Sequence, residues 1–152
     1  MVKSGDFMLM GEYHHNIDDK GRIIIPSKLR DELGDIVIAT RGLDNCIFIY
    51  KEEQWKNITS KLQTLPFTKK DARNFTRIFL SGATLCEFDK QGRIKLPLSL
   101  CSYALLDKEC IIIGVNDRLE IWSRDKWNDF FNDNNDSLSD MADHLFESDF
   151  GD

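Results

Sequence analysis

The sequence has 152 residues, enough for one compact domain or two small ones, and 41% of them are hydrophobic. This composition excludes collagen-like, disordered and disulfide-scaffold chains for most of the length. The formal net charge is −6, but it is unevenly distributed. Residues 61–100 carry eight basic and three acidic side chains, whereas residues 132–152 carry seven acidic and no basic ones. The basic centre is compatible with a polyanionic partner such as DNA.

The four cysteines, Cys46, Cys86, Cys101 and Cys110, lie far apart in the sequence and include no Cys-x-x-Cys pair. Three of them lie in apolar runs, so we expect reduced, buried thiols in a cytosolic protein. The first residues lack the pattern of a signal peptide, and no apolar run approaches the about 20 residues that a membrane span needs. We therefore expect a cytoplasmic protein that does not enter the membrane.

One sequence pattern occurs twice. Residues 17–26 read I-D-D-K-G-R-I-I-I-P and residues 88–97 read F-D-K-Q-G-R-I-K-L-P, with Asp, Gly, Arg, Ile and Pro in the same register. A second block is repeated as well, because I-Y-x-x-x-x-W from Ile49 is matched by I-W-x-x-x-x-W from Ile121. Agreement over two separated blocks indicates duplication. We infer a single domain, residues 8–131, with two copies of one unit and a helical linker between them; the copies span 13–58 and 83–130, and the linker 59–82.

The sequences of the two copies predict the same order of strands and helices. In the first copy we expect strands at 13–17 and 22–25, a helix at 27–33, strands at 36–39 and 46–50, and a helix carrying Trp55. In the second copy we expect strands at 84–88 and 93–96, a helix at 98–106, strands at 110–114 and 119–122, and a helix carrying Trp127. The Asp-x-x-Gly between the first two strands is typical of a type I turn. Pro26 and Pro97 suit the first position of the helix that follows.

The sequence of the linker predicts two helices. Trp55, Ile58, Leu62 and Leu65 recur at helical spacing until Pro66 interrupts, and Thr68-x-x-Asp71 predicts the cap of a second helix. In that helix the apolar residues share one face, and the opposite face carries Lys70, Arg73 and Arg77. This basic stripe has two interpretations: the solvated face of a helix that packs on the core, or a set of secondary phosphate contacts.

The C-terminal residues 132–152 are rich in Asp, Asn and Ser, which predicts a mobile acidic extension. The alternative is a short amphipathic helix that docks onto a neighbouring subunit, through Leu138, Met141, Leu145 and Phe146. The sequence leaves both open.

Because an isolated hairpin is marginal in water, the two copies should pair with each other. We predict a mainly β fold with short helices, in which both copies build a small β-barrel with pseudo-twofold symmetry. This symmetry would place the two turns on related surfaces. The predicted binding residues there are Lys20, Arg22, Lys90, Gln91 and Arg93.

The repeated arginines suit nucleic-acid recognition, because the planar guanidinium holds two phosphate oxygens, or O6 and N7 of guanine, at once. The residues expected to structure the turns are Asp18, Gly21, Asp89 and Gly92, since each carboxylate can accept backbone N–H groups within its turn. The alternative for Arg22 and Arg93 is an Asp–Arg salt bridge that stiffens the hairpin and needs no ligand.

Several segments together resemble one known family, MraZ. They are M-G-E-Y at 10–13, D-D-K-G-R-I-I-I-P at 18–26, A-R-N-F-T-R-I-F-L-S-G-A at 72–83, D-K-Q-G-R-I-K-L-P at 89–97 and R-L-E-I-W at 118–122. MraZ belongs to the AbrB-like, swapped-hairpin group of transcription factors. The resemblance covers about residues 8–130, so residues 1–7 and the acidic tail lie outside it.

The resemblance implies a swapped-hairpin fold and a regulator that binds double-stranded DNA. The expected targets are short repeated boxes in the promoter of the division and cell-wall gene cluster, including the protein's own gene. It further implies nucleoid association and assembly into homo-oligomeric rings. The family's duplicated motif falls on Asp18, Lys20, Gly21 and Arg22, and again on Asp89, Gly92 and Arg93. Gln91 stands where the first turn has Lys20, so the second turn is less basic.

Other functions find weaker support in the residues. Paired aspartate loops occur in aspartic proteases, but both turns here lack the Ser or Thr and Gly that follow the aspartate there. His14 and His15 are adjacent and point to opposite faces of a strand, so we expect no metal site. We also expect no cofactor, no small-molecule substrate and no enzymatic activity. The main alternative is an oligomeric, antitoxin-like AbrB-type scaffold without promoter specificity of its own.

Overall fold

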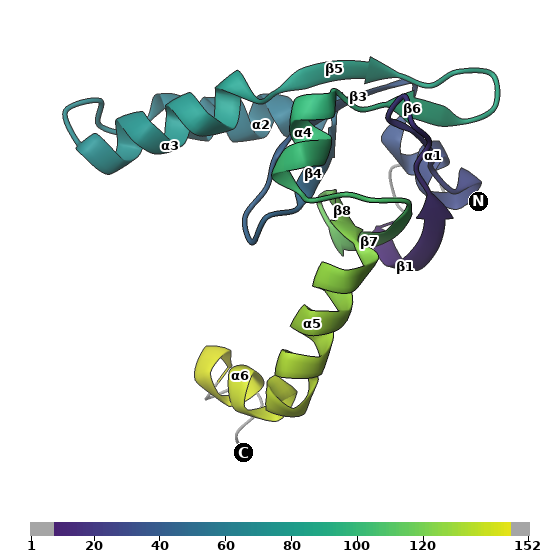
Figure 1. Cartoon of the computed structure of the whole chain (residues 1–152). Helices are drawn as coiled ribbons and strands as arrows, with labels where there is room; N and C mark the ends of the chain where they lie inside the picture. Colours follow the sequence, from purple (N-terminus) through teal and green to yellow (C-terminus); the bar gives the residue numbers. More distant parts are fainter. Residues whose placement is uncertain (1–7, 147–152) are drawn as a thin grey trace, which may run out of the picture.

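The computed structural model describes residues 8–146 (Figure 1). The first copy contains β1 (Leu9–Asn16), β2 (Arg22–Ile24), α1 (Ser27–Leu33), β3 (Ile36–Arg41), β4 (Ile47–Lys51) and α2 (Glu52–Gln63), and α3 (Lys70–Ser81) follows. The second copy contains β5 (Thr84–Glu87), β6 (Arg93–Lys95), α4 (Leu98–Tyr103), β7 (Glu109–Asn116), β8 (Leu119–Ser123) and α5 (Arg124–Asn134). A short 3-10 turn, Asn135–Ser137, leads into α6 (Leu138–Leu145). The repeated order of elements is therefore confirmed.

The strands exchange partners between the copies. Six strands form an antiparallel sheet in the order β1-β7-β8-β4-β3-β5, and β2 and β6 form a separate antiparallel pair. The first strand of each copy pairs with the third strand of the other copy, β1 with β7 and β5 with β3, and β4 and β8 meet at the centre. This confirms a mainly β, swapped arrangement with pseudo-twofold symmetry. The described strands thus form two separate sheets. One isolated bridge among the described residues, between Ile17 just after β1 and Ile23 of β2, links them.

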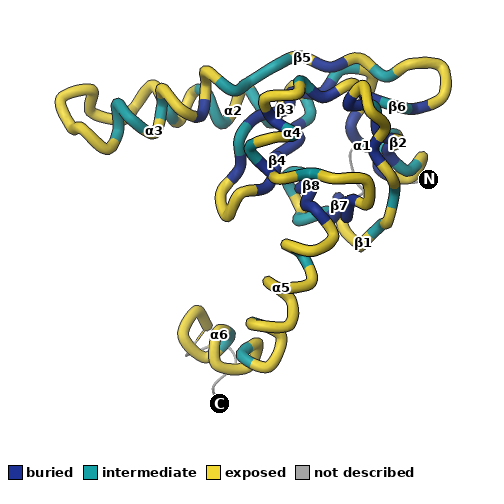
Figure 2. The backbone as a smooth tube through the Cα atoms, in the orientation of Figure 1, coloured by how far each residue is buried: buried dark blue, intermediate teal, exposed yellow. Residues whose placement is uncertain are grey.

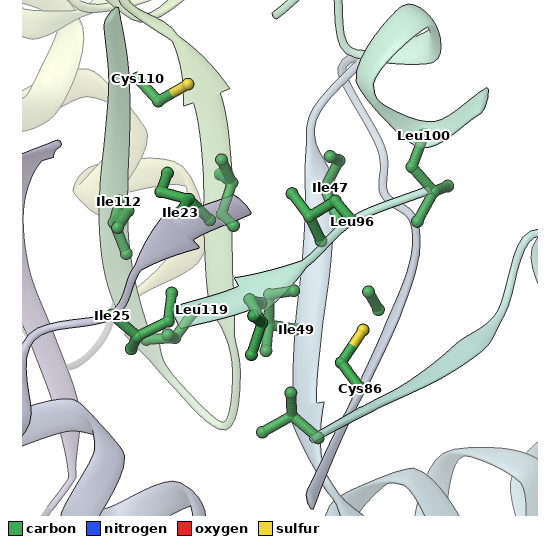
Figure 3. Packing of buried hydrophobic residues seen from close by; sticks show 14 of the residues in the cluster. Ile23, Ile25, Ile47, Ile49, Cys86, Leu96, Leu100, Cys110, Ile112 and Leu119 are labelled. Carbon is green, nitrogen blue, oxygen red and sulfur yellow. The ribbon is translucent and has the colours of Figure 1, made fainter. Parts of the chain in front are cut away.

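The main core lies between the six-stranded sheet and the β2–β6 pair (Figure 3). Ile23 and Ile94, at the centre of that pair, are almost fully buried against inward residues of the large sheet such as Ile49 and Ile112. Burying each such side chain contributes about 1.5–3 kcal/mol. The two short strands are therefore held by packing as well as by their few hydrogen bonds.

The other face of the large sheet carries the helices that end each copy. Trp55 of α2 stacks on Phe79 of α3 with ring centroids 5.6 Å apart, and Trp127 of α5 contacts Trp122 of β8 at 5.4 Å. Thr40 of β3 donates a hydrogen bond to the main-chain carbonyl of Phe79 at 2.5 Å. Figure 2 shows that α3 and the α5–α6 segment are nevertheless largely exposed and project from the sheet. None of the helices between residues 8 and 146 is long and apolar enough to span a membrane.

Several boundaries differ from the sequence prediction. Pro26 and Pro97 are the N-caps and not the first helical residues, because their backbone is extended while their carbonyls already accept the first helical bonds. Thr68 does not cap α3, whose N-cap is Lys69. Of the two alternatives for the acidic tail, the structure has the helix up to Leu145; residues 147–152 lie outside the described part.

Candidate nucleic-acid interface

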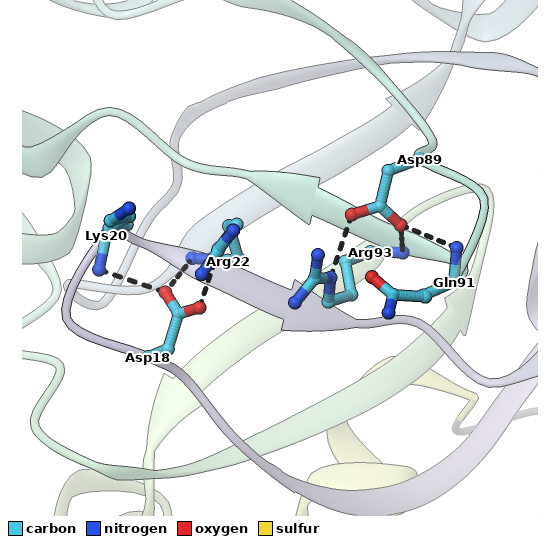
Figure 4. A network of polar contacts seen from close by, with 6 residues as sticks. All are labelled: Asp18, Lys20, Arg22, Asp89, Gln91 and Arg93. Carbon is cyan, nitrogen blue, oxygen red and sulfur yellow. Dashed lines mark hydrogen bonds and ion pairs between the residues drawn. The ribbon is translucent and has the colours of Figure 1, made fainter.

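The two repeated Asp-x-x-Gly turns lie at the ends of the β2–β6 pair (Figure 4). Ile23 pairs with Ile94 at the centre of these strands, and both side chains enter the core. Because side chains alternate along a strand, the residues on either side of each isoleucine project to the outer surface. Arg22 and Arg93 therefore emerge next to each other on the same face, as Figure 4 shows.

Each turn is built around its aspartate. In the first turn, Oδ1 of Asp18 accepts the backbone N–H groups of Lys20 and Arg22, both at 2.9 Å, while the N–H of Gly21 donates to the Asp18 carbonyl at 3.0 Å. In the second turn, Asp89 accepts the N–H groups of Gln91 and Arg93 at the same distances. The backbone N–H of the arginine, followed by its side chain, lowers the pKa of each aspartate. Both carboxylates therefore stay ionised to lower pH than in an open chain.

The aspartates also orient the arginines. Nε of Arg22 lies 2.7 Å from Oδ2 of Asp18, and Nε of Arg93 lies 2.8 Å from Oδ2 of Asp89. The salt bridge that the sequence left open as an alternative is thus present in both turns. It occupies only the Nε edge: among residues 8–146, neither Nη atom of either arginine makes a hydrogen bond. The side chains of Arg22 and Arg93 are 35% and 26% exposed, so both remain partly accessible to a ligand.

Each turn is further fixed by the strand of the other copy. The N–H of Leu96 donates to the carbonyl of Gly21 at 2.8 Å, and the N–H of Ile25 donates to that of Gly92 at 3.0 Å. Both glycines have positive φ, 84° and 78°. A Cβ on Gly21 would clash with the carbonyl oxygen of Leu96, whereas one on Gly92 would meet the guanidinium of Arg30. The two turns are therefore equivalent in hydrogen bonding but not in their surroundings.

Two residues of this face, and one residue of α1 beside it, were not among the sequence candidates. Lys95 projects outward opposite Arg22, and Ile24, 41% exposed, projects outward opposite Arg93. Period-two alternation around Ile23 and Ile94 would have identified both positions. Arg30 of α1 donates from Nε to the carbonyl of Ile25 at 2.9 Å, which brings its guanidinium against Gly92. No local pattern indicates that contact, because it depends on how α1 meets the other copy.

The remaining sequence candidates divide between two places. Lys20, Lys90 and Gln91 are exposed in the two turns, beside the arginines. The basic residues of α3 are elsewhere, because Figure 1 shows α3 projecting from the end of the molecule away from β6. There, Arg73 donates to the carbonyl of Phe67 at 3.0 Å. Lys70, Arg73 and Arg77 are thus not brought together with the arginine pair.

The metal-ligating and thiol side chains are placed as follows. No three His, Cys, Asp or Glu side chains between residues 8 and 146 are grouped to hold a metal ion. The cysteines are unpaired there, and burial raises the pKa of Cys86 to about 11 and that of Cys110 to about 12. These thiols are therefore protonated at neutral pH and are poor nucleophiles.

Comparison with known proteins gives consistent matches. The model of one family, described as "MraZ protein, putative antitoxin-like", matches the chain twice, at residues 8–78 and 79–149. The second match includes α5 and α6.

Curated relatives also match over nearly the whole chain. A protein named transcriptional regulator MraZ from Thermoanaerobacter pseudethanolicus is 56% identical over 140 residues, covering 92% of this chain and 98% of the relative. The protein of the same name from Lactobacillus gasseri is 54% identical over 138 residues, covering 91% and 96%. With two family-model matches and relatives at this identity, the chain belongs to the MraZ family.

Proposed function

We propose that the protein is a transcriptional regulator that binds double-stranded DNA through the outer surface of the β2–β6 pair. This surface, the arginine face, consists of Lys20, Arg22, Ile24, Lys90, Gln91, Arg93 and Lys95. The observation that carries the proposal is the matched pair of guanidinium groups, each held at Nε by an aspartate, with no hydrogen bond at Nη to any of residues 8–146. The name shared by the relatives supports a role in transcription.

The geometry suits contact with a DNA groove. A guanidinium held at Nε loses little rotamer freedom on binding, so more of the contact energy is retained. Its two Nη groups can donate to a phosphate, or to O6 and N7 of guanine. A two-stranded β-ribbon is narrow enough to enter the major groove. Arg22 and Arg93 would make the central contacts, with the turn residues on either side.

The proposed targets are short repeated boxes in the promoter of the division and cell-wall gene cluster, including the protein's own gene, and the proposed location is the nucleoid. One arginine face offers few phosphate contacts, so a single subunit should bind weakly and lose affinity steeply with salt. Assembly into a homo-oligomeric ring, which we also propose, would place several faces on successive boxes. Linking contacts in this way raises the overall affinity by about 10²–10⁴.

A gel-shift titration with the DNA upstream of the protein's own gene tests the proposal. Arg22→Ala and Arg93→Ala should each weaken binding about 5- to 150-fold, since a good bidentate contact is worth about 1–3 kcal/mol. Lys56→Ala, which removes an exposed charge from α2, is the matched control and should bind like the wild type. Circular dichroism would verify that each variant is folded.

Undiminished binding by folded Arg22→Ala and Arg93→Ala would refute the assigned face. Absence of any specific binding by the wild type, with assembly intact, would favour the scaffold without promoter specificity.

A further inference from the structure

The outer surface of the β2–β6 pair carries four side chains in a two-by-two arrangement. Because burial alternates along both strands, Ile23 and Ile94 enter the core, while the residues on either side of each point outward. These outward residues are Arg22 and Ile24 on β2, and Arg93 and Lys95 on β6. Three of them are cationic and one is apolar. Ile24 is thus an exposed apolar side chain in the middle of the arginine face.

The packing of the core does not require an isoleucine at this position. Ile24 is 41% exposed and belongs to neither of the buried hydrophobic clusters of residues 8–146. Its neighbours Ile23 and Ile25 are almost fully buried and supply the apolar surface that this strand packs against the sheet. The equivalent position of the second copy holds Lys95, so the same place in the fold accepts a charged residue. An exposed isoleucine among cations is therefore best explained by an apolar group on the ligand.

Double-stranded DNA offers one such group at the edges of its bases. In the major groove each base presents hydrogen-bonding groups, and thymine alone adds a methyl group, at C5. Apolar side chains are the usual contacts of that methyl group. Ile24 can make this contact at little entropic cost, because a β-branched side chain in a strand is already restricted at χ1.

The strand register places Ile24 beside an arginine contact. Ile24 lies directly opposite Arg93, and side chains at directly opposite positions have Cβ atoms about 4.5–5.5 Å apart. Successive base pairs are about 3.4 Å apart, so Ile24 lies within about two base pairs of the group that Arg93 contacts. Insertion between base pairs as an apolar wedge is not open to Ile24, because it lies in the middle of the ribbon, between Arg22 on its own strand and Arg93 on the next. The methyl group at the groove edge is therefore the apolar group within its reach.

We infer that Ile24 contacts the C5 methyl group of a thymine in the major groove, next to the group that Arg93 contacts. The inference rests on the proposed binding of DNA by the arginine face and specifies one base that this face reads. The half of the site beside Arg22 has no such contact, because Lys95 stands at the equivalent position. Contact with one thymine methyl group therefore also fixes the orientation of the DNA site on the face.

Replacement of thymine by deoxyuridine tests the inference, because it removes the C5 methyl group and leaves base pairing unchanged. The probe is the shortest duplex from the upstream DNA that the wild type binds specifically, with its thymines replaced one at a time. Titrations by fluorescence anisotropy at fixed salt should reveal one position per box at which the wild type binds about fourfold more weakly, the effect of burying about one methyl group. Replacement of the other thymines should leave the affinity unchanged.

Variants of Ile24 assign the effect to this side chain. Ile24→Ala should bind the thymine duplex more weakly than the wild type by about fourfold or more, and should bind the thymine and deoxyuridine duplexes equally. Ile24→Val keeps the β-branched methyl groups and should remain sensitive to the missing methyl group. Leu43→Ala, which removes an exposed leucine from the loop between β3 and β4, is the matched control and should behave like the wild type. Circular dichroism would verify that each variant is folded.

The titrations of the wild type can refute the inference without any variant. Specific binding in which no thymine is sensitive to loss of its methyl group would overturn the inference and leave the proposed DNA binding in place. A sensitive thymine at which Ile24→Ala shows the same loss as the wild type would do so too, because another residue would then contact the methyl group. Absence of specific binding by the wild type would refute the proposed function, and the inference with it.

Discussion

Arg22 lies directly opposite Lys95 across the β2–β6 pair, whereas its counterpart Arg93 lies opposite Ile24. The pseudo-twofold arrangement therefore has an extra positive charge beside one arginine and an exposed apolar side chain beside the other. Arg30, which lies against Gly92, has Cys101 at the equivalent position of the second copy, and this adds to the asymmetry. A face of this kind should have two unlike halves and should bind a box in one orientation.

The first prediction concerns these unlike positions. Lys95→Ala should weaken DNA binding and reduce the slope of log K against log salt by about 0.9, the value for one lost phosphate contact. Ile24→Lys should increase that slope by a similar amount. Titrations of the upstream DNA by fluorescence anisotropy at several salt concentrations measure both slopes. Equal slopes for the wild type and Lys95→Ala would mean that Lys95 does not contact phosphate.

The second prediction concerns the two turn glycines. Gly21→Ala should be the more destabilising substitution, because its new Cβ would meet the Leu96 carbonyl oxygen, which is main chain. Gly92→Ala would meet the Arg30 side chain, which can move away. Positive φ alone costs about 1–2 kcal/mol in each turn, and the backbone clash adds about 1–3 kcal/mol for Gly21→Ala only. Urea unfolding of the two variants measures their free energies of unfolding. An equal loss of unfolding free energy in both variants would contradict the predicted asymmetry.

The third prediction follows from the lowered pKa values of Asp18 and Asp89. Because the folded protein holds these carboxylates ionised below their usual pKa of 3.8, their contribution to stability is complete above that pH. It is lost as the pH falls from 3.8 through the lowered folded-state values.

The double variant Asp18→Asn/Asp89→Asn should therefore be less stable than the wild type by a constant amount between about pH 5 and 7. Below about pH 4 the difference should shrink. Urea unfolding of both proteins across this range measures the difference. A gap that persists unchanged to pH 3 would mean that the ionised carboxylates do not stabilise the turns.

The fourth prediction concerns the number of boxes. DNA with three boxes should bind at least about 10²-fold more tightly than DNA with one box at the same salt concentration, because later contacts become intramolecular. Box spacings near about 10 base pairs should be best, since they present the same groove to neighbouring subunits. Gel shifts with synthetic one-box and three-box DNA make the comparison.

The sequence predicted the order of elements well because the relevant interactions are short-range. An aspartate four residues before an arginine accepts backbone N–H groups within its own turn. In the strand that follows, burial alternates, so that Ile23 and Ile25 enter the core and Ile24 faces outward. The duplication then indicated that both copies fold alike. The errors were local as well: Pro26 precedes its helix by one residue, and α3 begins without the cap expected at Thr68.

What the sequence by itself determined was the pair of Asp-x-x-x-Arg turns and the segments that could form strands. Only the tertiary structure decided that β2 pairs with β6, that Lys95 meets Arg22, that Arg30 reaches Gly92 and that α3 lies away from the arginine face. The physical reason is that turns and amphipathic faces arise from neighbours along the chain, whereas strand register and helix placement depend on burying apolar surface contributed by both copies at once.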